Sequence, residues 1–164
     1  MTRRNSAPDV VANVEPATLH SVRGRSLYVT PIRLLLGVAW LVAGRAAGAP
    51  ATAAVLAFVG GAALTCFTLL NDPRARFRAQ LEPQPVPADV SIASPVRQAL
   101  AATIPSTLGV SVLAALALAA QPTLTAVLGG ISAGLGVAGA LSALATDPDL
   151  LFDPRRKALY RRSR

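Results

Sequence analysis

The chain has 164 residues, of which 52% are hydrophobic and 15% are charged, and its formal net charge is +8. A soluble domain usually contains about 25% charged residues, and a disordered chain has low hydrophobicity, so the composition is that of an integral membrane protein. A single cysteine excludes a disulfide framework, and a single histidine excludes a His-rich metal cluster.

The charges lie in blocks that leave two long apolar stretches. Residues 34–71 contain one charged residue, Arg45, and residues 98–146 contain none. Because a membrane span needs about 20 apolar residues, each stretch is long enough for two spans. Prolines at Pro50 and Pro122 divide the stretches. The sequence therefore predicts four transmembrane helices, over 31–48, 50–70, 96–120 and 122–145.

These spans are expected to be helical. Segments such as 112–118 show no alternation of apolar and polar residues, as the strands of a membrane barrel would. The predicted fold class is an all-α integral membrane protein with two tandem helical hairpins, 30–72 and 95–147. A cleaved signal peptide is the alternative for 31–48, but a long polar segment precedes it and a second span follows at once.

Basic residues predict the orientation. All but one of the 16 Lys and Arg residues lie outside the apolar stretches and on one side. The positive-inside rule makes that side cytoplasmic. Three cytoplasmic pieces follow: a flexible N-terminal segment over 1–29, a Pro-rich loop over 73–94 and a basic tail over 148–164. We interpret the net charge as a topology signal, and nucleic acid is not an expected partner.

The basic tail is expected to anchor the chain at the membrane surface. Asp153 and Pro154 are suited to the cap and first residue of a short basic helix that would lie against anionic phospholipids. The anchoring residues of this helix are Arg155, Arg156, Lys157, Arg161 and Arg162.

The two hairpins resemble each other in sequence. Thr-Pro-Ile-Arg at 30–33 opens the first, and Ser-Pro-Val-Arg at 94–97 opens the second. The hairpins close with Asn-Asp-Pro at 71–73 and Thr-Asp-Pro at 146–148. Proline favours the first helical position, so each helix is expected to start there, with the following arginine at the lipid headgroups. Duplication of one hairpin explains the match, and turn chemistry common to unrelated hairpins explains it equally well.

Small residues recur at every fourth position on two of the predicted helices. Positions i and i+4 share one face of a helix, so each stripe forms a shallow groove where another backbone can approach closely. The partner is either another helix of the chain or another protein. Gly129, Gly136 and Gly139 widen the small surface of the last helix, which is therefore expected to be surrounded by protein. The groove residues are Ala53, Ala57, Gly61, Thr65, Ala126, Gly130, Gly134 and Ala138.

A proline and an arginine lie inside the predicted spans. Pro105 should kink its helix, and the hydroxyls of Thr103, Ser106 and Thr107 are placed to satisfy the carbonyls that a kink frees. Arg45 is the only charge inside a predicted span and lies near the outer surface. It is expected either to snorkel to that surface or to contact a lipid or a partner carboxylate.

The sequence predicts no catalytic, metal or cofactor site, and so no enzyme. The spans contain no Asp, Glu, His or Lys, and no triad, phosphate loop or dinucleotide fingerprint occurs. The leading hypothesis is an accessory subunit that binds other membrane protein subunits in a larger complex. The alternative is a small homo-oligomeric transporter or lipid flippase. Fifteen Arg against one Lys suggests a GC-rich genome, and hence a bacterial inner membrane.

Overall fold

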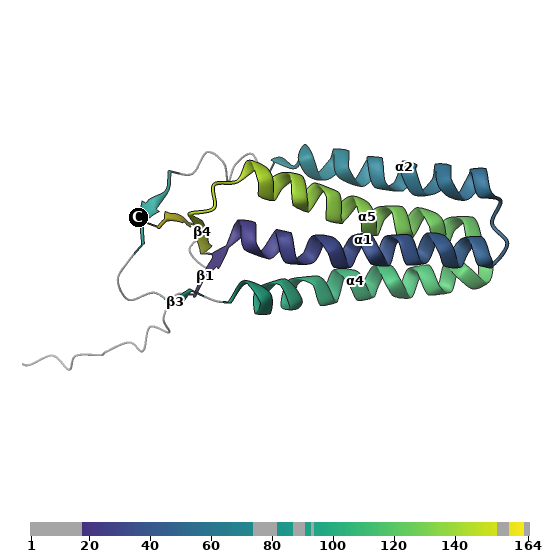
Figure 1. Ribbon diagram of the computed structural model, residues 1–164, viewed down its shortest axis with the longest axis horizontal. Coiled ribbons are helices and arrows are strands. Elements are labelled where there is room, and N and C mark those ends of the chain that lie inside the picture. The colour runs from purple at the N-terminus through teal and green to yellow at the C-terminus, as the bar shows by residue number, and fades with distance from the viewer. Residues whose placement is uncertain (1–17, 74–81, 87–90, 93, 154–157, 163–164) are drawn as a thin grey trace, which may run out of the picture.

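Four long helices make up most of the computed structural model (Figure 1). The structure describes residues 18–73, 82–86, 91–92, 94–153 and 158–162. The helices are α1 (Val22–Ala46), α2 (Ala51–Leu70), α4 (Pro95–Ala120) and α5 (Pro122–Ala145). All four are long and apolar enough to cross a membrane, as predicted from the sequence.

Helix α1 begins nine residues before the predicted start. The side chain of Ser21 accepts a hydrogen bond of 3.1 Å from the Gly24 backbone N–H and so caps the helix at Val22. Pro31 therefore lies inside the helix and not at its first position. The prediction of a flexible segment up to residue 29 is wrong from Thr18 onward. Proline marks a favourable helix start, but a side-chain cap further upstream takes precedence here.

The helices do not pack as two separate hairpins. α5 lies between α1 and α2, contacts both along their length, and also contacts α4 (Figure 1). α1 and α2 are joined by a short turn yet make few contacts with each other. The two hairpins therefore interlock, with α5 as the central helix.

The composition of α5 explains its central position. It is the most buried of the four candidate spans, and most of its buried residues are Gly or Ala. Without large side chains, van der Waals contact between backbones becomes the main source of attraction between apolar helices. The helix with the most small residues is therefore the one that three neighbours can approach.

A small five-stranded sheet covers the end of the bundle opposite the two helix turns (Figure 1). Its spatial order is β2-β5-β4-β1-β3. The strands are β1 (Thr18–Ser21), β2 (Gln84–Pro85), β3 (Ser91–Ile92), β4 (Leu150–Asp153) and β5 (Ala158–Arg161). The sheet joins all three segments that the sequence predicts to lie outside the membrane.

Long-range pairing and a small apolar core hold this sheet together. β1 pairs antiparallel with β4, with His20 opposite Phe152, and β4 pairs antiparallel with β5. Leu19, Leu151 and Tyr160, from three different strands, form one buried cluster. The prediction of a basic helix in the tail is wrong for Ala158–Arg161, because this segment buries Tyr160 as a strand.

Candidate functional site

The predicted grooves of α2 and α5 face each other inside the chain. A Cβ built on Gly61 would lie 2.6 Å from the carbonyl oxygen of Val127, and one on Gly134 would lie 2.6 Å from that of Ala62. A Cβ on Gly130 would overlap the backbone of Phe58. These two helices are therefore in backbone contact, and the small residues are used within the molecule.

Three of the remaining groove residues lie at this contact, because Ala57 packs against the cluster that contains Ala126, and a Cβ on Gly134 would lie 2.9 Å from the Thr65 Cβ. Ala126 and Ala138 are buried, and Thr65 donates a hydrogen bond of 2.8 Å to the Gly61 carbonyl. Ala53 and Ala57 are half-buried on α2.

A second glycine contact joins α5 to α1, and the four-residue spacing rule missed it. A Cβ on Gly37 would lie 2.6 Å from the Gly129 carbonyl, and one on Gly44 would lie 2.7 Å from that of Pro122. Gly37 and Gly44 are seven residues apart, which also places them on one helix face. The seven-residue spacing of these two glycines was the feature of the sequence from which this contact could have been predicted.

Arg33 is half-buried within α1, eleven residues after the start of the helix at Val22. Because α1 starts early, Arg33 is the eighth residue of the candidate span Ser26–Ala46. Its Nη2 donates a hydrogen bond of 2.9 Å to the Ser106 hydroxyl on α4. Its carbonyl accepts a hydrogen bond of 3.2 Å from Ser132 on α5. Arg33 therefore joins α1, α4 and α5 in a polar seam, and its expected position at the lipid headgroups stays a prediction.

Other hydroxyls extend this polar seam. Thr30 donates to the Gly136 carbonyl across to α5 at 3.1 Å. Ser26, Thr30 and Arg33 follow each other at spacings of four and three, so they share one face of α1. This polar stripe was the signal that a helix extends upstream of Pro31.

Two of the hydroxyls around Pro105 donate hydrogen bonds to carbonyls of α4. A proline at 105 leaves the carbonyl of residue 101 without its helical partner. Thr103 donates to the Ala99 carbonyl, and Ser106 donates to the Thr103 carbonyl at 3.3 Å. The Thr107 hydroxyl is buried and has no hydrogen-bond partner among the described residues.

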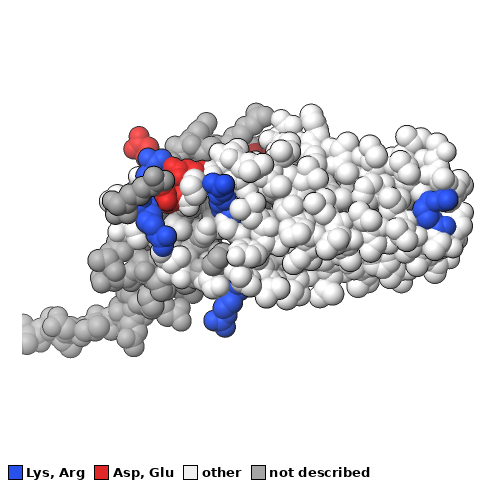
Figure 2. All heavy atoms as spheres, in the orientation of Figure 1, with Lys and Arg blue, Asp and Glu red and all other residues white. Residues whose placement is uncertain are grey.

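Arg45 closes the turn between α1 and α2. Its Nη1 donates a hydrogen bond to the Ala49 carbonyl, next to Gly48, whose φ is +102°. The side chain is exposed. In Figure 2 one small group of basic atoms lies at this end of the helices, and the other basic atoms and the acidic atoms in view lie toward the sheet end.

Part of the predicted membrane anchor lies on the sheet. Arg161 forms an exposed ion pair of 2.9 Å with Asp147, and Arg162 is exposed. Arg155, Arg156 and Lys157 lie outside the described residues.

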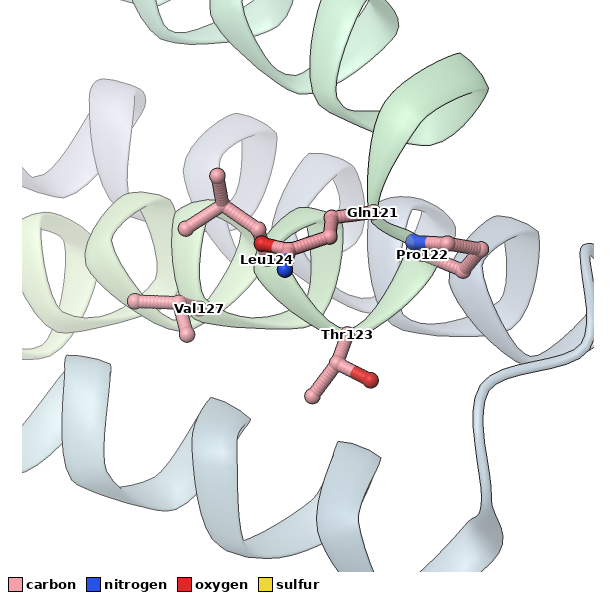
Figure 3. Close-up of a pocket in the computed structure, with 5 residues that line it drawn as sticks. All are labelled: Gln121, Pro122, Thr123, Leu124 and Val127. Atoms are coloured by element: carbon pink, nitrogen blue, oxygen red, sulfur yellow. The ribbon is translucent and has the colours of Figure 1, made fainter.

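A shallow open depression lies beside the turn between α4 and α5 (Figure 3). Its volume is about 340 Å³, and it is lined by Gln121, Pro122, Thr123, Leu124 and Val127. Its lining is mainly apolar and none of these side chains is titratable, so the depression offers no group for acid–base chemistry.

These features define a mostly helical protein with four helices that could span a membrane, a small sheet at one end and a polar seam around Arg33. No family model, curated protein or solved structure matches the chain.

Proposed function

We propose that this chain is a non-catalytic accessory subunit of a larger protein complex in a bacterial inner membrane. It crosses the membrane four times, with the sheet and both termini in the cytoplasm. The observation that carries the proposal is the contrast between the packed faces and the exposed faces of the helices. The glycine faces of α5 are closed by its own neighbours, whereas the outer faces of α2 and α4 stay apolar and exposed.

The interior of the bundle supports a structural role. α5 meets α1 and α2 through glycine-to-carbonyl contacts that leave no space for a Cβ atom. A solute path along either contact would require the helices to separate.

The outer faces offer area to lipid and to partner subunits. α2 packs mainly on α5, so most of its circumference is exposed. Leu56, Leu64 and Phe67 on α2 are each about two-thirds exposed (67%, 66% and 68%). Apolar side chains of this kind suit both acyl chains and the helices of another membrane protein.

The distribution of charge supports the proposed orientation. The sheet end of the bundle carries Arg161 on β5, Arg162 directly after it, and Arg23 and Arg97 in the first turns of α1 and α4, whereas Arg45 lies at the opposite end. The positive-inside rule then assigns the sheet to the cytoplasm. There the sheet would present a folded surface next to the membrane.

Photo-crosslinking in the native membrane tests the proposal. A photoreactive phenylalanine analogue replaces Phe67, which is exposed on α2, in an otherwise unchanged chain. Phe58 is the matched control, because the same replacement there packs against the buried cluster of Ala54 and Ala126. We expect Phe67, but not Phe58, to give a discrete adduct with a different membrane protein, to be identified by mass spectrometry. Adducts with lipid alone would contradict an accessory role.

A small homo-oligomeric transporter or lipid flippase is the second candidate. The observation in its favour is the polar seam, because a charged side chain inside a span is usually functional. A Phe67 adduct of twice the chain mass would favour this candidate. Transport in reconstituted vesicles would then be expected to depend on Arg33.

A further inference from the structure

We propose that Arg45 binds the phosphate of an anionic phospholipid whose acyl chains lie on the outer face of α1. The lipid belongs to the leaflet at the end of the bundle where the two helix turns lie. This inference goes beyond the proposed function and requires only that the helices span a membrane. Arg45 lies in the last turn of α1, and it is the only charged residue in 34–71 and in 98–146.

Arg45 lies at one end of an exposed apolar stripe on α1. Leu35, Val38 and Val42 are each at least half exposed. They follow each other at spacings of three and four residues, and Arg45 comes three residues after the last of them. All four side chains therefore share one helix face. The stripe combines an apolar length with a cation at its end, which is complementary to an acyl chain that ends in a phosphate.

The length of this stripe matches one leaflet of a bilayer. Leu35 and Arg45 are ten residues apart, which is about 15 Å along a helix and half of a hydrocarbon core of about 30 Å. The candidate span Ser26–Ala46 has 21 residues, and Arg45 is the last but one of them. In a membrane that matches this span, the guanidinium lies at the boundary between acyl chains and headgroups, where phosphates are abundant.

Charge complementarity favours a headgroup with a net negative charge. The acidic residues that the structure describes all lie at the sheet end of the bundle, and they are Asp72, Glu82, Asp147, Asp149 and Asp153. Asp72 follows α2, whose 20 residues place it about 30 Å from the turn. Arg45 is therefore too far from these carboxylates to form an ion pair with any of them.

The guanidinium of Arg45 keeps donors for a phosphate. Its Nη1 donates a hydrogen bond to the Ala49 carbonyl, which holds the group over the turn. A guanidinium has several N–H donors in one plane, so this bond leaves others available, and they match phosphate oxygens in pairs. A zwitterionic lipid offers the same phosphate together with a cation that Arg45 repels. We therefore expect selectivity for anionic lipids.

Photoreactive lipids test the proposal in the purified full-length protein, reconstituted into vesicles. Phosphatidylglycerol and phosphatidylcholine that carry a diazirine on one acyl chain are compared at equal mole fractions, and mass spectrometry locates the adducts. We expect more adducts with phosphatidylglycerol than with phosphatidylcholine between Leu35 and Val42. Adducts on α2, which has no charged residue, provide an internal reference and should show no such preference.

Three variants separate the charge of Arg45 from its other properties. Arg45→Gln should lower the preference on α1 about fivefold, the usual contribution of one basic residue at an anionic membrane surface. Arg45→Lys keeps the charge and should keep most of the preference. Arg97→Gln is the matched control, because Arg97 is an exposed arginine in the first turn of α4, at the opposite end of the bundle. This control should leave the preference on α1 unchanged.

Three outcomes would overturn the proposal. The first is equal labelling of the α1 stripe by the two lipids in the wild type. The second is an unchanged preference in Arg45→Gln. The third is loss of the preference on adding millimolar inorganic phosphate at constant ionic strength, which would assign Arg45 to a soluble phosphate.

A salt titration of the wild type keeps the proposal testable if Arg45→Gln fails to fold. Raising the ionic strength from about 0.05 M to about 0.5 M should weaken the preference on α1, because salt screens an exposed charge. An unchanged preference over this range would count against the site.

Discussion

Glycines in the same helices have different roles, which depend on what lies beside each one. Gly130 on α5 meets the backbone of Phe58, whereas Gly60 on α2 has no atom within 4 Å of a Cβ position. The four-residue spacing in the sequence picks out Gly130 and does not include Gly60. It does not say which helix lies opposite, because that depends on contacts between segments far apart in the chain.

Gly130→Ala should therefore destabilise the protein. The added methyl group would overlap backbone atoms, which cannot rotate away, so we expect a loss of about 1–3 kcal/mol in the free energy of unfolding. Gly60→Ala should change it by less than about 0.5 kcal/mol. Unfolding in mixed detergent micelles, followed by circular dichroism, measures both. Equal stability of the two variants would contradict the close approach of α5 to α2.

Gly48 provides a separate test at the turn between α1 and α2. Its φ of +102° lies in the region that other residues rarely adopt, although nothing lies within 4 Å of its Cβ position. Gly48→Ala should cost about 1–2 kcal/mol through backbone strain alone. Gly109→Ala, at an equally open position in the middle of α4, is the control and should be neutral in the same unfolding assay.

Helix limits were predicted accurately where proline and composition act together, and less accurately where a side chain caps the helix. α4 and α5 begin at Pro95 and Pro122, at or within one residue of the predicted starts. α1 begins earlier, at Val22, because Ser21 caps it. Pro31 and Arg33 therefore lie within the helix and not in its first turn.

A disulfide between α1 and α5 tests how these elements pack. A Cβ on Gly139 would lie 3.8 Å from the Thr30 Oγ1, an ordinary contact distance that suits a bridge. In a Cys66→Ser background, Thr30→Cys with Gly139→Cys should form an intramolecular disulfide on mild oxidation, seen as a mobility shift on non-reducing gels.

Gly139→Cys with Gly109→Cys is the matched pair that should stay reduced, because nothing lies within 4 Å of a Cβ on Gly109. Failure of the Thr30 and Gly139 pair to crosslink would contradict the central position of α5.

At the scale of the whole molecule, the sheet joins segments that lie more than 130 residues apart in the sequence, such as those of His20 and Phe152. Its two-residue strands β2 and β3 are too short to be recognised from sequence alternation. Pro85 on the edge strand β2 fits the rule that proline is tolerated at sheet edges. The sequence predicted a flexible segment, a Pro-rich loop and a short basic helix for these residues, because their apolar residues are few and find partners only across the chain.

Paired cysteines test the register of this sheet. His20 lies directly opposite Phe152 between β1 and β4, a position where Cα atoms are close enough for a disulfide. In a Cys66→Ser background, His20→Cys with Phe152→Cys should crosslink, as measured by loss of free thiols. His20→Cys with Leu150→Cys should not, since that diagonal pair is about 7–8 Å apart. The reverse result would mean a different register.

The sequence by itself determined the helical class, the four apolar spans and the small-residue faces, because these depend on local composition and spacing. Only the tertiary structure decided that α5 lies between α1 and α2, that Arg33 lies beside Ser106, and that three polar segments form one sheet. These arrangements depend on which distant surfaces fit together. Complementarity of that kind is a property of pairs of segments, and no single stretch of sequence contains it.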